Sequence, residues 1–158
     1  MAQIVQHQQP PQCEQRIVLR TLQEPDRVLD LLTDPDAAGL WSPLDFAVEE
    51  IDGARLQPGG RAILSGRLAG RWVEFELDVF EADDCRLSLQ ARGPVTMDVD
   101  YEVHEAELIA RVRVHGGRGI GGRLLSSAVD GMLAAGTLQV AVEAIAREAG
   151  ADELVLAA

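Results

Sequence analysis

Between Asp45 and His115, apolar residues alternate with polar ones in short runs, and this pattern limits the fold more than any other feature of the chain. Alternation with period two places successive side chains on opposite faces of a sheet, so each run is typical of a strand with one buried face. Turn-forming pairs separate the runs at Ala69-Gly70, Gly93-Pro94 and Glu105-Ala106. The stretch therefore predicts a meander of antiparallel strands.

The register of three hairpins follows from the requirement that apolar side chains share one face, because a slip of one residue would reverse every side chain. In the last hairpin, acidic residues then face basic ones on the other side, with Asp100 opposite Arg111 and Asp98 opposite Arg113. The predicted apolar pairs are Tyr101 with Ala110, Val99 with Val112, Met97 with Val114, Val73 with Gly66, Phe75 with Leu64, Leu77 with Ala62, Leu89 with Met97, and Cys85 with Tyr101.

Strand and helix patterns flank the meander. Residues 17–19 predict a first strand and residues 46–51 another, while Pro25 and Pro35 begin two short helices between them. From 121 to 149 apolar residues recur at helical spacing, which predicts one long amphipathic helix. Its apolar stripe comprises Leu124, Ala128, Gly131, Ala135, Leu138, Val142 and Ile145.

These elements predict an α+β fold, with a seven-stranded curved antiparallel sheet, two short helices after the first strand and a long C-terminal helix. Residues 1–14 are rich in Gln and Pro and predict a disordered N-terminal arm. Residues 15–150 form the predicted domain, and residues 151–158 are expected to be a C-terminal tail.

Composition removes several classes of function. A formal net charge of −12 disfavours nucleic acid and anionic membrane surfaces as partners. The chain has no lysine, which excludes Schiff-base chemistry and a P-loop lysine. No run approaches the ~20 apolar residues of a membrane span, so we expect a cytoplasmic protein without membrane insertion. The predicted register keeps His104 and His115 from facing each other and no third ligand converges on them, so we expect no metal site. We also expect no cofactor.

Gly117, Gly119 and Gly122 match the G-x-G-x-x-G fingerprint of dinucleotide-binding loops. That fingerprint needs a strand within a parallel sheet, followed by a helix and a second strand ending in an acid. Here the preceding strand is the last of an antiparallel series, and Glu143 falls within the predicted helix. We therefore interpret the glycines as a hinge between sheet and helix.

The order of elements resembles the START-like (SRPBCC, helix-grip) superfamily, in particular its polyketide cyclase/dehydrase and lipid-transport group. The resemblance covers roughly residues 16 to 149, and its signatures are the Glu24-Pro25 helix entry, the segment from Leu32 to Pro43, Gly59-Gly60, and the glycines before Leu124. It implies a START-like helix-grip domain over residues 15–150 that holds an apolar or aromatic molecule between helix and sheet. The chain is also similar to small proteins associated with carbon monoxide dehydrogenase maturation.

The face of the predicted sheet that points toward the helix carries no charge, and several small residues lie where the two layers meet. The resemblance favours a cavity there, although a solid core of the same residues is the alternative. The predicted ligand-binding residues are Trp41, Leu64, Gly66, Phe75, Leu77, Leu89, Met97, Val99, Tyr101, Val112, Ala128, Gly131, Met132 and Ala135.

Two residues are candidates for proton transfer. Tyr101 is the only polar side chain at the centre of the predicted inner face, and it is either a donor to a ligand oxygen or a core aromatic with a local partner. Regular alternation in the second strand would turn Glu49 or Glu50 inward, which makes Glu49 a candidate catalytic carboxylate. Trp41 either caps the entrance or fills the core.

Three functions remain open. The first is binding of an apolar small molecule such as a lipid, a polyketide or a related hydrophobic compound, and a homodimer is not excluded. The second is a polyketide cyclase, aromatase or dehydratase that acts on a poly-carbonyl substrate through Tyr101 and a rim carboxylate. The third is an adaptor or maturation protein for a larger enzyme, which would use Ile63, Trp72 and Phe80 on the outer face of the sheet.

Overall fold

The computed structural model of the 158-residue chain describes residues 13–21, 25–42, 45–117, 119–149 and 154–156. The strands are β1 (Cys13–Thr21), β2 (Phe46–Ile51), β3 (Arg61–Leu68), β4 (Arg71–Ala82), β5 (Arg86–Arg92), β6 (Val95–His104), β7 (Glu107–Gly117) and β8 (Leu154–Leu156). The helices are α1 (Pro25–Thr33), the 3-10 helix η1 (Pro35–Ala37), α2 (Ala38–Trp41), α3 (Gly119–Ala134) and α4 (Thr137–Glu148).

The strands form one antiparallel sheet in the order β2-β3-β4-β5-β6-β7-β1-β8. Strands β1 to β7 are the predicted seven-stranded sheet, and the short β8 pairs with β1 inside the segment expected to be a tail. Because β1 begins at Cys13, it also includes the last two residues of the expected arm. Residues 1–12 of that arm lie outside the described part.

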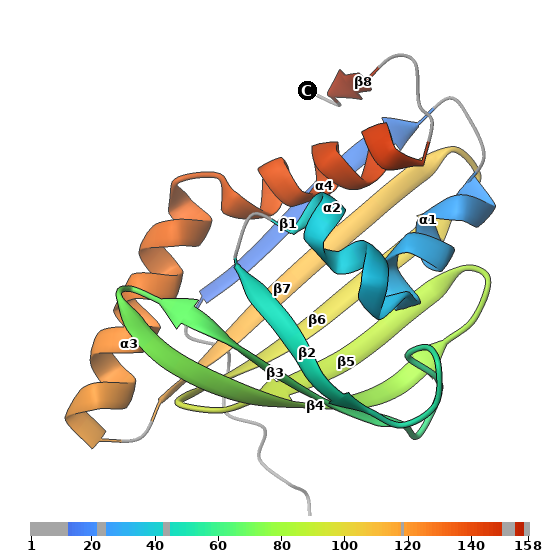
Figure 1. Ribbon diagram of the computed structural model, residues 1–158. Coiled ribbons are helices and arrows are strands. Elements are labelled where there is room, and N and C mark those ends of the chain that lie inside the picture. Colours follow the sequence, from blue (N-terminus) through green and yellow to red (C-terminus); the bar gives the residue numbers. More distant parts are fainter. Residues whose placement is uncertain (1–12, 22–24, 43–44, 118, 150–153, 157–158) are drawn as a thin grey trace, which may run out of the picture.

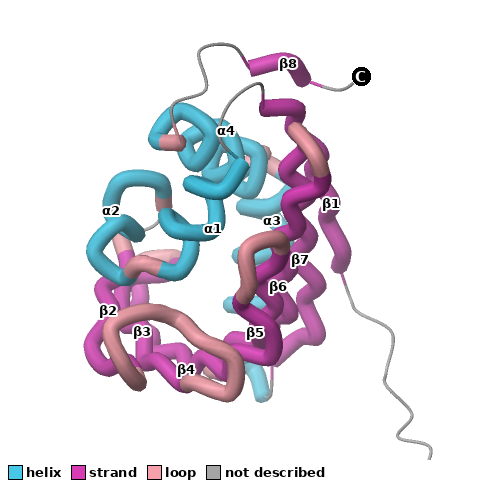
Figure 2. The backbone as a smooth tube through the Cα atoms, turned by 90° about the vertical axis from the view of Figure 1, so that its right-hand side faces the viewer, coloured by secondary structure: helices cyan, strands magenta, loops and turns pink. Residues whose placement is uncertain are grey.

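The helices gather on one side of the sheet, which bends around them (Figures 1 and 2). Helix α3 packs on β6 and β7, and α4 packs on β1 and β7 and against α1 and α2. The fold class predicted from the sequence is therefore confirmed.

The C-terminal helical segment has a break that the sequence analysis did not anticipate. Helix α3 ends at Ala134 and α4 begins at Thr137, with a bend of 56° between them. Gly136 lies at the break with φ +94°, a left-handed conformation that glycine adopts without strain. The break directs α3 along one part of the sheet and α4 across another.

Two of the three predicted registers are confirmed residue by residue. Tyr101 lies opposite Ala110 and Asp100 opposite Arg111 between β6 and β7. Phe75 lies opposite Leu64 between β3 and β4. In these hairpins the apolar pattern and the charge pattern both specify the same alignment.

The predicted register of β5 with β6 is wrong by two residues. Leu89 lies opposite Val99 rather than Met97, and Leu87 rather than Cys85 lies opposite Tyr101. The hairpin is centred on Pro94, because Arg92 pairs with Thr96, whereas the predicted pairs are centred on Gly93. A shift of two keeps every side chain on its predicted face, so the inner face is unchanged.

The apolar stripe of α3 is displaced from the predicted one. Its buried positions include Leu125, Val129 and Leu133, whereas Leu124 is 60% exposed. The cause is a close contact at the start of the helix, where a Cβ on Gly122 would lie 2.7 Å from the backbone carbon of Gly117. That contact turns Gly122 toward the sheet, and residues three, seven and eleven positions later follow it.

Candidate functional site

Two adjoining pockets lie between the helices and the inner face of the sheet, and together we call them the chamber. The larger lobe, about 250 Å³, is lined by α1, the η1–α2 segment and strands β2 to β6. The smaller lobe, about 180 Å³, lies under α3 and the start of α4. The chamber therefore occupies the place between sheet and helices that the sequence analysis predicted for a cavity.

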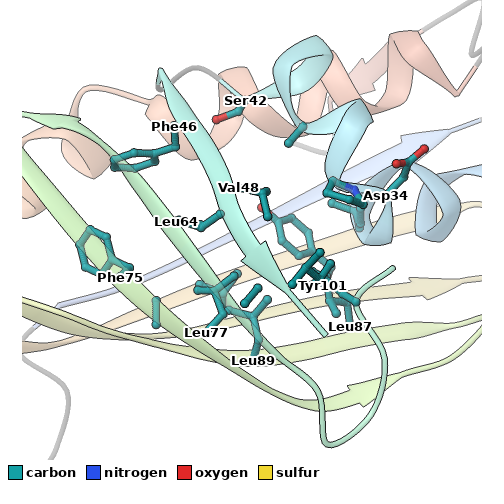
Figure 3. A pocket seen from close by; sticks show the side chains of 18 of the residues that line it. Asp34, Ser42, Phe46, Val48, Leu64, Phe75, Leu77, Leu87, Leu89 and Tyr101 are labelled. Carbon is teal, nitrogen blue, oxygen red and sulfur yellow. The ribbon is translucent and has the colours of Figure 1, made fainter. Parts of the chain in front are cut away.

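Six of the described residues line both lobes and so mark where the lobes meet. An aromatic pair, Phe46 on β2 and Phe75 on β4, stands there in a T-shaped arrangement with ring centroids 6.0 Å apart and planes at 73°. Figure 3 shows this pair and the Tyr101 ring among the surrounding aliphatic side chains. The residues shared by both lobes are Ser42, Phe46, Phe75, Met97, Val99 and Tyr101.

Tyr101 projects from β6 into the centre of the chamber, as predicted. Its side chain is only 6% exposed, and burial raises the pKa of the phenol to about 12. The hydroxyl therefore stays neutral at any physiological pH and can both donate and accept a hydrogen bond. This places one neutral polar group where the two lobes meet.

Among the described residues, the other polar side chains in the lining are Asp34, Ser42 and Thr137. Asp34 is the N-cap of η1, where its carboxylate accepts a hydrogen bond of 2.9 Å from the Asp36 amide. In Figure 3 its carboxylate points away from Tyr101. The carboxylate thus serves the helix start, and the groups offered to the chamber are mainly hydroxyls.

Gly66 was predicted to line the cavity, but the structure gives it a different role. A Cβ at Gly66 would overlap the Phe46 ring and lie 2.5 Å from the Asp45 carbonyl oxygen. The absence of a side chain on Gly66 thus lets the Phe46 ring settle onto β3. Phe46 itself lines the chamber and was missed, although its place on the predicted second strand was a usable signal.

The prediction that Glu49 faces inward is wrong. A β-bulge between Val48 and Glu50 interrupts the alternation, and both Glu49 and Glu50 are exposed. The Glu49 carboxylate accepts a 2.5 Å hydrogen bond from the Ser65 hydroxyl. Its candidacy as the catalytic carboxylate of the chamber is therefore withdrawn.

The predicted ligand-binding residues divide between sheet and helix. The sheet residues predicted besides Gly66 line the chamber, and Met132 of α3 lines its smaller lobe. Gly131 and Ala135 are exposed, and Ala128, which is half-buried, lies outside both lobes because of the displaced stripe. Leu133 lines the smaller lobe and was missed for the same reason. Trp41 ends α2, but its side chain lies outside the described part.

The outer face of strands β5 to β7 carries a network of polar side chains. Arg113 Nη2 lies 3.1 Å from Asp100 Oδ2, and His115 Nε2 lies 2.6 Å from Asp98 Oδ2. Burial alone would raise the pKa of Asp98, but hydrogen bonds from His115 and Gln90, with the charges of His115 and Arg113, hold it below its usual value. The register predicted a charge ladder of Asp98, Asp100, Arg111 and Arg113 on this face, but the ion pairs join diagonal neighbours instead of the directly opposite residues.

Two searches across the described residues bear on other kinds of site. They contain no cluster of three or more His, Cys, Asp or Glu side chains arranged to hold a metal ion. None of the described helices alone has the length and apolar character to cross a membrane, although α3 and α4 pass that test when taken together as a bent pair.

Comparisons with known proteins give likeness in structure alone. No family model and no curated protein matches the chain. Protein CV1439 from Chromobacterium violaceum is 17% identical with a TM-score of 0.65, over 88% of this chain and 98% of that one. Major latex-like protein 151 from Panax ginseng is 9% identical with a TM-score of 0.60, over 86% and 96%. Ara h 8.0201 is 12% identical with a TM-score of 0.57, over 87% and 97%. These likenesses show that the chain has the helix-grip fold.

Proposed function

We infer that the protein binds an apolar small molecule, such as a lipid, a polyketide or a related hydrophobic compound, in the chamber between sheet and helices. The observation that carries this proposal is the two-lobed cavity, whose lining is aliphatic and aromatic apart from a few hydroxyls and Asp34. An apolar ligand gains roughly 25 cal/mol for each Å² of its surface removed from water. The interior thus favours ligands that water solvates poorly.

Catalysis by a cyclase, aromatase or dehydratase is the second candidate, and Tyr101 is the observation in its favour. General acid–base chemistry on a poly-carbonyl chain needs a second proton-transferring group close to that hydroxyl. Glu49 is on the outer face, and Asp34 caps η1. Binding without chemistry is therefore the better-supported function.

An adaptor role depends on a different surface. Trp72 and Phe80 are 68% and 60% exposed, and Ile63 is half-buried. A pure adaptor would be expected to have a filled interior, whereas this domain keeps two adjoining lobes. The chamber therefore supports ligand binding over an adaptor role.

A chamber-filling variant tests the proposal. Val99 lines both lobes and is half-buried, so Val99→Trp is expected to occupy the space where they meet. Binding of the neutral dye Nile red, followed by fluorescence titration, should weaken by about tenfold or more, because ~1.4 kcal/mol of lost contact changes an equilibrium tenfold. Ala62→Leu, which narrows only the larger lobe, should weaken binding less.

The control places the same bulk on the other side of the same strand. Glu102 is exposed on β6, so Glu102→Trp should leave dye affinity within about twofold of the parent, in line with the small effect of most surface changes. Circular dichroism and thermal melting show whether each variant is folded. Equal dye binding by folded Val99→Trp and by the parent would rule out the chamber as the binding site.

A further inference from the structure

We propose that the chamber selects uncharged lipophilic molecules and rejects the same molecules when they end in a carboxylate, an inference that rests on the proposed function. The starting point is the kind of polar group that the lining offers. Tyr101 and Ser42 lie where the lobes meet and Thr137 lies in the smaller lobe, and each provides a neutral hydroxyl. Among the described lining residues, the one acidic side chain is Asp34 and none is basic.

An entering carboxylate would exchange its water shell for these hydroxyls and the negative charge of Asp34. Moving an ion from water into an apolar interior without a counter-ion disfavours binding by a factor on the order of a hundred or more. The phenol of Tyr101 can donate one hydrogen bond to the carboxylate, which offsets only part of the free energy lost when the carboxylate leaves water. The chain's net charge of −12 adds a further repulsion at long range.

Each arginine side chain that the structure describes lies away from the two lobes. Arg111 pairs with Glu14 and Arg113 with Asp100 on the outer face of the sheet. Arg55, near the end of α1, is engaged with Asp30 and Thr33. These three arginines therefore cannot neutralise a buried anion without leaving their partners.

The start of helix α4 favours anions, and the stabilisation that it provides can be compared with the cost of removing a carboxylate from water. Helix α4 begins at Thr137, so its first amide groups and the positive end of its dipole lie beside the smaller lobe. Such a helix start stabilises a nearby negative charge by about twofold to fivefold in binding terms. That gain is much smaller than the desolvation penalty, so neutral ligands remain favoured.

A matched set of ligands tests the inference on the parent protein. Dodecanol, methyl dodecanoate and dodecanoate share one chain and differ in the charge at its end. At about pH 8, far above the ~4.3 pKa typical of a carboxyl, dodecanoate should displace Nile red at least ~30-fold less well than the two neutral compounds. Between about pH 6 and pH 5, where the neutral acid makes up more than about one part in a hundred, its apparent affinity should rise about fourfold to tenfold, because the neutral acid binds in preference to the anion.

A gain-of-function variant provides the complementary test. Thr137→Lys would place a cation at the edge of the smaller lobe, and the ratio of dodecanoate affinity to dodecanol affinity at about pH 8 should rise about tenfold. Ser127→Lys, on the exposed side of α3, is the control and should change neither. Thermal melting confirms that both variants are folded.

The results of these experiments distinguish a failure of the charge selection from a failure of the proposed ligand binding. If dodecanol and dodecanoate bind the parent within about threefold of each other and Val99→Trp weakens both, the charge selection is wrong and the chamber function stands. If neither dodecanol nor its methyl ester displaces the dye, the proposed function fails together with the inference. A flat pH profile for dodecanoate would also overturn the selection.

Discussion

Tyr101 is the only tyrosine in the chain, so phenolate absorbance reports its ionisation directly. Burial raises its pKa to about 12, compared with about 10 for a tyrosine in water. In a spectrophotometric titration we expect the folded protein to show its phenolate midpoint near 12, and the urea-unfolded chain near 10. A folded-state midpoint near 10 would show that water reaches the hydroxyl.

The same shift makes stability depend on alkaline pH. The folded state holds its proton to a higher pH than the unfolded state, so the stabilising contribution is complete below pH 10 and is lost as pH rises toward 12. Tyr101→Phe should therefore lose less stability between pH 10 and pH 12, as measured by urea denaturation.

Tyr101→Phe should also bind ligands that carry a ketone about threefold to tenfold more weakly, because the phenylalanine cannot donate a hydrogen bond to the ketone oxygen.

At the scale of single elements, two glycines of the C-terminal helical segment form a matched pair. A Cβ at Gly131 or at Gly136 would meet nothing within 4 Å, so the two positions differ in backbone conformation and not in available space. Gly131→Ala is expected to stabilise the protein by about 0.5–1 kcal/mol, because alanine suits a helix interior. Gly136→Ala is expected to destabilise it by about 1–2 kcal/mol, because φ is +94° there. Urea denaturation measures both, and equal effects would contradict the assigned break.

Elements also show which parts of the fold the sequence could predict. The β6–β7 register was predictable because apolar pairs and opposite charges, such as Asp98 with Arg113, agree on one alignment. The β5–β6 register was not, because a shift by two keeps the same faces and only the turn geometry at Pro94 distinguishes the alternatives. The bulge after Val48 has no clear sequence signature, and it moved Glu49 out of the chamber.

The helical side of the site was harder to predict than the sheet side. Helix α3 is rich in small and apolar residues on more than one face, so periodicity alone does not fix which face is buried. The contact between Gly117 and Gly122 fixes it, and that contact joins a strand end to a helix start. Tertiary contacts of this kind are not visible in the pattern of one element.

For the molecule as a whole, ligand binding should appear as thermal stability. A neutral ligand at ~100 times its dissociation constant adds about 2.7 kcal/mol, provided that the unfolded chain does not bind it. For a domain of this size that corresponds to a rise in Tm of roughly 5–10 °C. Dodecanol should give such a rise in the parent and a much smaller one in Val99→Trp. An equal rise in both would place the ligand elsewhere, for example on the exposed surface near Trp72 and Phe80.

The position of β2 at one end of the strand order affects how a guest enters. This strand bonds to β3 alone, and its pairing is already interrupted after Val48. It also supplies Phe46, Val48 and Ile51 to the wall of the larger lobe. Separation of β2 from β3 would open this wall without breaking the other strand pairs, so we expect a ligand to enter the larger lobe beside β2.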